Sequence, residues 1–471
     1  MTHNEDTICA IATAPGGALG IIRVSGPQAV GSVAPLFHAR SGHPLDEISP
    51  GHTTFGEIRD DNGTLIDEAV VTLYRAPHSY TGEDSVEISC HGSAYILQTV
   101  LRLLTAHGCR LARPGEYTER AFLNGKMDLS QAEAVADLIA AHNAATHRMA
   151  MNQMRGGYSR ELHRLRERLV HLTSLLELEL DFSDHEDLEF ADRSELEHIA
   201  TEIDRKISRL TDSFRLGNAL KRGIPVSIVG ETNAGKSTLL NALLDEERAI
   251  VSSVSGTTRD AIEATKTLDG ITFRFIDTAG IRHTSDEVEN IGIQRTFQKI
   301  EQADIVLWLI DASRAEEQYH RLRPGLLPLC RDKQLIVLLN KADTLGDAAR
   351  AACTTITALL AQDKAGARIV LPLSAKTHTG LDDLETALTR CISLNDLRPD
   401  EPIIANERHY EALSAARDAI RRVTRGLHSH LPADLLSEDL RECIHHLAEI
   451  IGEIHSDTIL KNIFKNFCIG K

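Results

Sequence analysis

The chain has 471 residues, which allows about three domains of roughly 150 residues each. Its 42% hydrophobic and 25% charged residues are typical of a soluble globular protein, and its 51 basic against 68 acidic residues give a net charge of −17. This charge argues against a protein that coats nucleic acid by bulk attraction. The eight cysteines follow neither CxxC nor CxH spacing, which argues against a zinc site or a disulfide framework.

Residues 1–122 are expected to form an α+β domain. Short β-like runs at 7–13, 19–24, 69–73 and 86–89 alternate with glycine and proline turns. The chain begins with an acidic stretch and has no arginine before Arg23, unlike a signal peptide or a mitochondrial presequence. Its apolar runs have strand length and stay far below the about 18 residues of a spanning helix. We therefore expect a cytoplasmic protein without membrane insertion.

Residues 123–218 and 385–471 are expected to be helical. Residues 130–133 match a capping box, with Ser130 as the N-cap. Apolar residues share one helix face at Leu162, Leu165, Leu169, Leu172 and Leu176, again at Leu436, Leu440, Leu447 and Ile451, and on a last helix at Ile459, Ile463 and Phe467. Because neither half buries its stripe alone, we expect one discontinuous helical domain. Two unrelated helical regions are the alternative.

Residues 219–384 are expected to form a doubly wound α/β domain, because short apolar runs alternate there with helical stretches. The segment 230–237, GETNAGKS, matches GxxxxGK[ST] between a predicted strand at 224–229 and a predicted helix at 238–244. Its glycines let backbone N–H groups point at phosphates, Lys236 can reach the β- and γ-phosphates, and Ser237 can ligate Mg²⁺. The alternative is a glycine-rich turn before an ordinary helix.

Three further motifs favour GTP. In 277–280, Asp277 can hold Mg²⁺ through water and the Gly280 N–H can meet the γ-phosphate. Asp343 can accept the two N–H groups of guanine that adenine lacks, and a backbone amide of 374–376 can face the guanine oxygen. The predicted contacts are Asn233, Ala234, Gly235, Lys236, Ser237, Thr238, Asp277, Thr278, Ala279, Gly280, Asn340, Lys341, Asp343, Ser374, Ala375 and Lys376.

The chain as a whole resembles the MnmE (TrmE) family of tRNA-modification GTPases. The resemblance rests on RPGE at 113–116, ERAFLN at 119–124, GTTRD at 256–260, DTAGIR at 277–282 and the final FCIGK at 467–471. The GTPase motifs alone would also fit a GTPase that docks on ribosomal subunits. That rival usually carries a basic RNA-binding domain, whereas this chain is acidic and has only 4% aromatic residues.

The resemblance implies a Ras-like P-loop GTPase domain inserted into the helical domain. It implies an enzyme that works with the flavoprotein MnmG (GidA), in a heterotetramer or larger complex, and adds a carboxymethylaminomethyl or aminomethyl group to carbon 5 of the wobble uridine of certain tRNAs. The domain 1–122 would bind 5-formyl- or 5,10-methylene-tetrahydrofolate and form a homodimer contact.

The family's folate contacts fall on Arg23, Glu87, Lys126 and Lys471. The chemistry is compatible, because an anionic glutamyl tail suits Arg or Lys and the donors of a pterin suit a carboxylate. Without the resemblance, Glu87 fits better on the outward face of a strand, since it alternates with apolar Val86 and Ile88.

GTP hydrolysis here needs a substitute for the glutamine of Ras-like enzymes, because Ile281 and Arg282 follow the Asp-x-x-Gly motif. The Asn233 side-chain carbonyl can coordinate a monovalent cation, for which the resemblance implies K⁺ in place of an arginine finger. The implied cage consists of Asn233, Ser252, Val254 and Thr257. The family's other GTP contacts fall on Ser252, Ser253, Val254, Ser255, Gly256, Thr257 and Thr258, and its Mg²⁺ ligands on Ser237 and Thr258.

Glu289 is the water-orienting residue by resemblance, although Asp286 and Glu287 fit equally well on sequence alone. Family members commonly carry proline where Thr232 stands and threonine where Ser252 stands. Both changes leave backbone oxygens for the ion.

Cys468 lies near Lys465 and Lys471, which can lower the pKa of a thiol. A role in tRNA modification and a buried, inert thiol are equally favoured for it.

Overall fold

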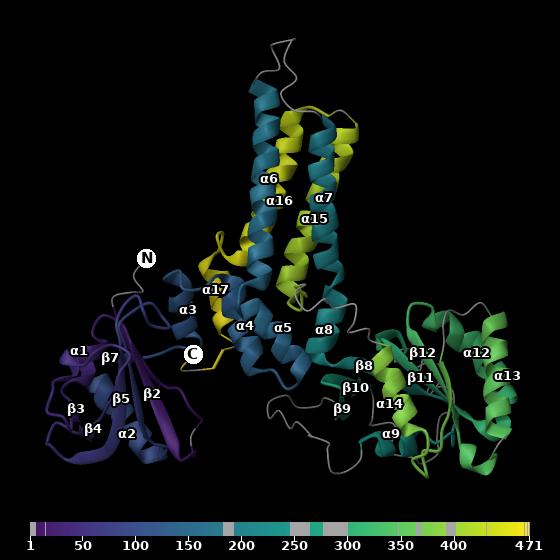
Figure 1. Cartoon of the computed structure of the whole chain (residues 1–471), viewed down its shortest axis with the longest axis horizontal. Helices are drawn as coiled ribbons and strands as arrows, with labels where there is room; N and C mark the ends of the chain where they lie inside the picture. The colour runs from purple at the N-terminus through teal and green to yellow at the C-terminus, as the bar shows by residue number, and fades with distance from the viewer. Residues whose placement is uncertain are drawn as a thin grey trace. The chain divides into compact units, whose positions relative to one another are not determined.

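The computed structural model describes residues 6–14, 16–181, 193–244, 264–276, 300–346, 348–363, 369–391, 402–429, 431–465, 467–468 and 470. The chain divides into two compact units. Met1–Ala140, Ala150–Ser208 and Glu411–Lys471 form the first, and Ala141–Met149 with Arg209–Tyr410 form the second. Figure 1 labels the helices and strands. No helix within the described ranges is both long and apolar enough to cross a membrane.

A seven-stranded sheet forms the N-terminal part of the first unit. Its strands are β1 (Thr7–Ile11), β2 (Leu19–Ser25), β3 (Phe37–Ala39), β4 (Thr53–Arg59), β5 (Leu65–Tyr74), β6 (Ser85–His91) and β7 (Cys109–Leu111), in the order β3-β4-β5-β6-β2-β1-β7. Of the neighbouring strands, β1 and β7 are parallel and the other pairs are antiparallel. The helices α1 (Ala29–Val33) and α2 (Ala94–Ala106) pack on the face that buries Leu73 and Ile88. The α+β prediction is confirmed.

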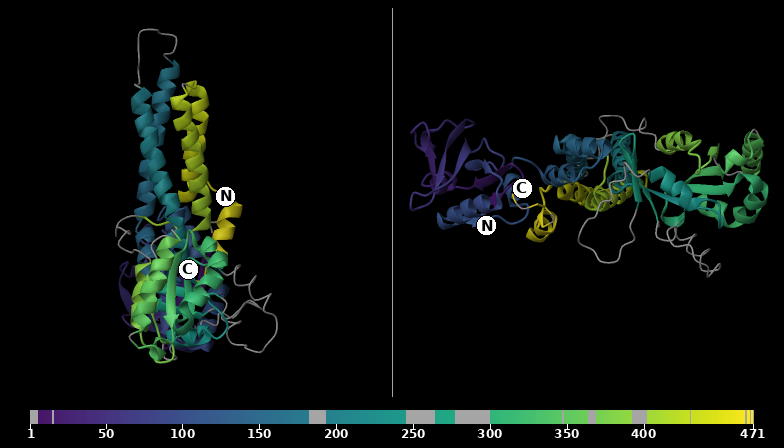
Figure 2. Two further views of the ribbon diagram at one scale, coloured as in Figure 1. Left: turned by 90° about the vertical axis from the view of Figure 1, so that its right-hand side faces the viewer. Right: turned by 90° about the horizontal axis from the view of Figure 1, so that it is seen from below.

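The rest of the first unit is helical. Its helices are α3 (Glu116–Leu123), α4 (Leu129–Ile139), α5 (Ala144–Met154), α6 (Gly157–Asp181), α7 (Arg193–Asp212), α15 (Glu407–His428), α16 (Ala433–Ile451) and α17 (Asp457–Phe464), of which α5, α7 and α15 extend into the second unit. Helix α6 packs against α16, and Figure 2 shows α6 and α7 beside the yellow C-terminal helices. Every residue of the two long predicted stripes is at most 2% exposed. The domain bounds 123–218 and 385–471 stay predictions.

The start of α4 corrects the predicted capping box. Asp128, not Ser130, is the N-cap: its carboxylate accepts from the Gln131 N–H at 2.9 Å, and Gln131 Oε1 accepts from the Asp128 N–H at 2.9 Å. Ser130 lies inside the first turn, where its hydroxyl donates to Asp128 Oδ1 at 2.7 Å. Aspartate and serine are about equally good N-caps, and here the geometry of the first turn places the Asp128 carboxylate, not the Ser130 hydroxyl, at the cap.

The last helix, α17, corrects a second prediction. Its buried side chains are Leu460 and Phe464, which pack with Leu129 of α4, whereas the predicted Ile459 and Ile463 are only half-buried. The predicted Phe467 lies beyond the end of the helix and is also half-buried. The buried face is therefore rotated by one residue from the predicted stripe.

A buried charge network connects α3 with the chain around it. Glu116 and Arg120 are each 2% exposed and lie 3.3 Å apart. Glu116 also accepts from Arg110 at 2.5 Å and from the Arg113 backbone N–H at 2.7 Å, while Arg120 donates to Asp6 Oδ1 at 2.6 Å. Burial raises the pKa of Glu116, but the hydrogen bonds from Arg110 and Arg113 and their positive charges outweigh it and lower the pKa to about 2.

This network predicts acid sensitivity of the first unit. A carboxyl whose pKa falls from 4.5 when unfolded to about 2 when folded stabilises the fold above pH 4.5, and this contribution is lost as the pH drops toward 2. Above pH 4.5 this shift contributes on the order of 3 kcal/mol to the free energy of unfolding. We expect the free energy of unfolding, measured by urea unfolding followed by circular dichroism, to fall as the pH is lowered. Glu116→Gln should make this pH dependence smaller. The exposed Glu47→Gln is the control, and an equally steep acid loss in Glu116→Gln would contradict the assignment.

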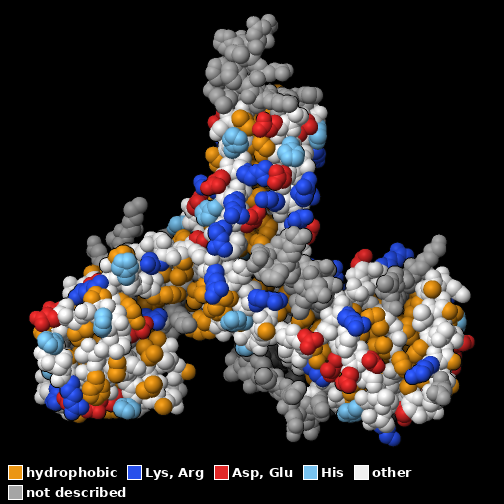
Figure 3. All heavy atoms as spheres, viewed as in Figure 1, with side chains coloured by type: hydrophobic (Ala, Val, Ile, Leu, Met, Phe, Trp, Pro, Cys, Tyr) orange, Lys and Arg blue, Asp and Glu red, His pale blue; other side chains and the backbone are white. Residues whose placement is uncertain are grey.

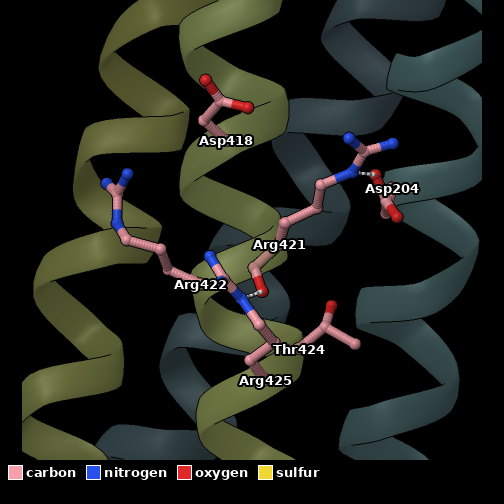
Figure 4. Close-up of a pocket in the computed structure, with 6 residues that line it drawn as sticks. All are labelled: Asp204, Asp418, Arg421, Arg422, Thr424 and Arg425. Carbon is pink, nitrogen blue, oxygen red and sulfur yellow. Dashed lines mark hydrogen bonds and ion pairs between the residues drawn. The ribbon is translucent and has the colours of Figure 1, made fainter.

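An open pocket of about 530 Å³ lies on the helical part of the first unit (Figure 4). It is lined by Asp204, Asp418, Arg421, Arg422, Thr424 and Arg425. Arg421 pairs with Asp204 at 3.2 Å, and Arg422 pairs with Asp439 at 2.6 Å and with Glu442. Figure 3 shows basic and acidic side chains intermingled over these helices. Because Arg421 and Arg422 are paired with carboxylates and Arg425 donates to the Arg421 carbonyl oxygen, this pocket is not a built anion site.

The second unit contains a six-stranded sheet with helices on both faces. Its strands are β8 (Ile224–Val229), β9 (Ala264–Leu268), β10 (Ile271–Phe275), β11 (Ile305–Asp311), β12 (Gln334–Asn340) and β13 (Ile369–Pro372), in the order β13-β12-β11-β8-β10-β9. Of the neighbouring strands, β9 and β10 are antiparallel and the other pairs are parallel. Its helices are α8 (Phe214–Arg222), α9 (Lys236–Leu244), α12 (Ala315–Leu326), α13 (Ala348–Gln362) and α14 (Leu381–Arg390).

Separate cores lie on the two faces of this sheet. One contains side chains of α9 and α14, and the other contains side chains of α12 and α13. The doubly wound prediction is confirmed. Since the carboxyl ends of parallel strands meet at one edge, the segments that follow β8, β11 and β12 lie where such folds bind ligands.

Candidate nucleotide site

The loop between β8 and α9 can bring backbone N–H groups close to a phosphate. Asn233 and Gly235 adopt positive φ angles of 63° and 99°. A Cβ on Gly235 would lie 2.3 Å from Asn340 Nδ2, and a Cβ on Gly230 would lie 2.3 Å from the Leu309 carbonyl oxygen. Only glycine fits at these two positions, and the loop leads directly into the N-terminus of α9. This backbone fits a bound phosphate chain.

Lys236 is folded over this loop. Its ammonium donates to the Gly230 carbonyl oxygen at 2.9 Å and to the Glu231 carbonyl oxygen at 2.7 Å. Ser237 follows in the first turn of α9, half-buried, and the Asn233 side chain is exposed. The predicted phosphate residues Asn233–Thr238 are therefore contiguous at the carboxyl end of β8.

Asn340 joins three predicted contact segments. This side chain, 3% exposed, donates from Nδ2 to the Ala234 carbonyl oxygen at 2.8 Å and accepts at Oδ1 from the Ala375 N–H at 3.0 Å. The Ala342 N–H donates to the Leu373 carbonyl oxygen at 3.0 Å. The phosphate loop, the segment 340–343 and the segment 374–376 are thus brought together, as a single nucleotide site requires.

The side chains predicted to read the base lie at the surface of this arrangement. Asp343 is exposed in the short helix η4 (Ala342–Thr344), and Lys376 is also exposed. Ser374 is 1% exposed, and its N–H donates to the Thr379 carbonyl oxygen at 2.9 Å. Asp343 is therefore accessible to a base that reaches the loop.

Several predicted site residues lie outside the described residues. They are Ser252, Ser253, Val254, Ser255, Gly256, Thr257, Thr258, Asp277, Thr278, Ala279, Gly280, Glu289 and Lys471. Their roles at the γ-phosphate, the two cations, the attacking water and folate stay predictions.

The predicted folate residues Arg23 and Glu87 meet on the N-terminal sheet. They are direct partners across β2 and β6, and the Arg23 Nε donates to Glu87 Oε1 at 2.9 Å. The Arg23 guanidinium lies 5.6 Å from the ring centre of Tyr80 and 5.7 Å from that of Tyr117. Its Nη1 is 3.5 Å from the Gly470 carbonyl oxygen. The side chain of Glu87 therefore faces outward on its strand and is also held by a cation.

Lys126 and Cys468 contact other segments of the first unit. Lys126 donates from Nζ to the Pro77 carbonyl oxygen at 2.9 Å. The Cys468 carbonyl oxygen accepts from the Gly115 N–H at 3.3 Å, and its thiol is exposed. The prediction that the Cys468 thiol is buried is therefore wrong, and its role in tRNA modification stays a prediction.

Two family models match most of the chain. The model described as GTP-binding protein TrmE N-terminus matches residues 7–126, and the model described as MnmE helical domain matches residues 129–468. The chain is similar to the tRNA modification GTPase MnmE of Phocaeicola vulgatus, 55% identical over 502 residues and covering 99% of both chains. The chain belongs to the MnmE family.

Other members of the MnmE family show the same full-length similarity. That of Bacteroides thetaiotaomicron is 56% identical, with 99% of this chain and 100% of that protein covered, and that of Flavobacterium psychrophilum is 46% identical, with 99% of each covered. A solved structure of Aquifex aeolicus Era is 28% identical over 41% of this chain and 66% of that chain. Its TM-score of 0.28 is too low to support an argument about the fold.

Sequence reasoning missed three side chains that contact predicted site residues and a fourth, Gln318, that contacts one of these three. Tyr80 and Tyr117 flank Arg23, and Asp311 and Gln318 adjoin the segment 340–343. Asp311 had a detectable signal, because it directly follows the apolar run 305–310 at the carboxyl end of a predicted parallel strand. The tyrosines had none, since only the fold brings them to Arg23.

Proposed function

We propose that this member of the MnmE family, together with the flavoprotein MnmG, adds a carboxymethylaminomethyl or aminomethyl group to carbon 5 of the wobble uridine of certain tRNAs. The one-carbon unit would come from 5-formyl- or 5,10-methylene-tetrahydrofolate. Membership of a family of tRNA modification GTPases makes the chain a GTP-hydrolysing enzyme of tRNA modification. The protein would act in the cytoplasm as a homodimer, in a heterotetramer or larger complex with MnmG.

The bridging side chain of Asn340 is the observation that carries the nucleotide part. It holds the phosphate loop and the two predicted base-reading segments in one arrangement. When GTP binds, the Lys236 ammonium would leave its two carbonyl partners and bind the phosphates. Asp343 would accept the guanine N–H pair. Mg²⁺, held by Ser237 and Thr258, would supply positive charge to the β- and γ-phosphates.

K⁺ is the second proposed cation. Asn233, at the exposed tip of the phosphate loop, would hold it with Ser252, Val254 and Thr257 when two GTPase domains pair. The ion would supply the charge of an arginine finger, and Glu289 would orient the attacking water.

Folate would bind beside Arg23 and Glu87. The exposed ring of Tyr80 lies beside an arginine that pairs with a carboxylate, which combines a planar surface with a cation and an acceptor. These are the groups that a pterin ring and an anionic tail need. Lys126 and Lys471 would contribute further positive charge, and Cys468 a thiol near the tRNA base.

Mass spectrometry of tRNA nucleosides from a deletion strain tests this function. Loss of the modified wobble uridine, restored by the intact gene, is the expected result. Normal tRNA with defective ribosomal subunits would instead support a GTPase that acts in ribosome assembly.

The folate site gives a separate prediction. Arg23→Ala and Lys126→Ala are each expected to lower the modified nucleoside to the level of the deletion strain, while basal GTP turnover stays within about twofold, because both residues lie in the first unit. Arg40→Ala is a matched control: Arg40 is an exposed arginine of the same unit, 3.6 Å from Glu68. An equal loss of modification and GTP turnover would point to misfolding or to a wrong division of the domains.

A further inference from the structure

Asp311 ends β11 at the edge of the sheet that carries the nucleotide loops. It is the register partner of Asn340 on β12. Its Oδ1 accepts from the Ser313 N–H at 3.0 Å and from the Ser313 hydroxyl at 2.7 Å, and its Oδ2 accepts from Lys341 Nζ at 2.7 Å. Burial raises the pKa of Asp311, but the bonds from Lys341 and Ser313 outweigh it and keep the pKa below its usual value. Asp311 is therefore a carboxylate at neutral pH.

The Lys341 side chain runs from the predicted guanine loop to this carboxylate. Lys341 has a φ angle of 63°, a left-handed conformation that is uncommon for a residue with a side chain. It lies between Asn340, whose amide is bonded to two other segments, and Asp343. An anchor at the end of the Lys341 side chain helps to hold this unusual backbone, and with it the position of Asp343.

A buried glutamine fixes Asp311 from the other side. Gln318 of α12 is 3% exposed, and its Oε1 accepts from the Asp311 N–H at 2.8 Å. Tyr319, the next residue, is fully buried and stacks on Trp308 of β11 at 5.4 Å between ring centres. The Asp311 carboxylate is therefore held in place by the packing of α12 against β11. It can accept a hydrogen bond without a rearrangement of the surrounding structure.

We propose that Asp311 is a positioning residue for guanine selectivity: it anchors Lys341, which sets the loop that presents Asp343 to the base. The proposal rests on the guanine-nucleotide function proposed above. Asp311 itself would not touch the base. Breaking the anchor should therefore weaken selectivity for the groups that Asp343 reads more than it weakens binding of the phosphates.

Dissociation constants of GDP and IDP for the full-length protein test this inference. IDP lacks the exocyclic amine of guanine but has the same phosphates, so the ratio of the IDP constant to the GDP constant reports base reading alone. Asp311→Asn is expected to lower this ratio about tenfold, the effect of losing one charge-assisted bond. Lys341→Met keeps the methylene chain but loses the ammonium, and should give the same change. The double variant should add nothing further, because both changes break one contact.

Asp304→Asn is the matched control. Asp304 precedes the opposite end of β11 and pairs with Arg215 at 2.8 Å, so the change also removes one carboxylate from an ion pair of this unit. It should leave the ratio unchanged. Equal weakening of GDP and IDP in Asp311→Asn, or additive effects in the double variant, would overturn the positioning role. A wild-type protein that binds GDP no better than IDP and ADP would instead overturn the guanine-nucleotide function itself.

Discussion

Replacing K⁺ by Na⁺ is expected to slow steady-state GTP hydrolysis by at least about 10³-fold, the lower end of what an arginine finger contributes in related enzymes. The reason is that Ile281 leaves the site without a Ras-type glutamine and the exposed Asn233 offers a carbonyl oxygen for an ion of K⁺ size. GTP should still bind in both salts, because the phosphates and Mg²⁺ are proposed to be held by Lys236, Ser237 and the loop backbone. The measurement is turnover in matched K⁺ and Na⁺ buffers beside a binding titration.

Substitution of Asn233 supplies the internal comparison. Asn233→Ala should remove most of the K⁺ stimulation, whereas Asn241→Ala removes an exposed amide from α9 and should not. Light scattering with GDP and aluminium fluoride should report pairing of GTPase domains in K⁺ only. Equal rates of GTP hydrolysis in the two salts would contradict the cation mechanism and would favour Arg259 or Arg282 as an intrinsic arginine finger.

Asp343→Asn is expected to weaken GTP binding by at least about 10²-fold and to improve binding of xanthosine triphosphate. Sites built to hydrogen-bond a substrate group strongly reject analogues that lack it, since a buried donor or acceptor is left unpaired. Xanthine presents an oxygen where guanine has its amine, so an amide side chain matches it better. Asn340 and the Ala342 N–H hold the loop independently of Asp343, so the loop should keep its form.

Competition titrations with the two triphosphates measure this exchange. Asp382→Asn, a change at an exposed carboxylate of α14, serves as the control and should leave both affinities unchanged. Unchanged GTP affinity in Asp343→Asn would refute the assignment of Asp343 to the base.

The nucleotide part of the fold was largely predictable, because its signals are local. The central strands β11 and β12 are nearly continuous buried apolar runs, and the predicted run 224–229 coincides with β8. The phosphate loop needs glycine where the backbone turns or approaches Asn340 closely, so the residues that define the loop are neighbours in the sequence. By contrast, β3 and β7 have only three residues each and depend on pairing with β4 and β1, which no local pattern reveals.

The contacts made through the fold were not predictable. The capping-box prediction failed by two residues because Ser130 and Asp128 are both good caps, and only the geometry of the first turn decides between them. Likewise, Arg23 and Glu87 lie 64 positions apart in the chain, and their pairing follows from the register of β2 on β6. The sequence pattern correctly indicated that Glu87 faces outward but not what holds it.

Asn340 must donate and accept at the same time, and this requirement limits which residue can stand there. An aspartate of the same size could accept from the Ala375 N–H but could not donate to the Ala234 carbonyl oxygen, and a leucine could do neither. The need for both a donor and an acceptor, rather than the volume of the side chain, therefore makes this position intolerant of substitution. This one amide links three loops that lie between residues 230 and 376, so its loss should uncouple recognition of the phosphates from recognition of the base.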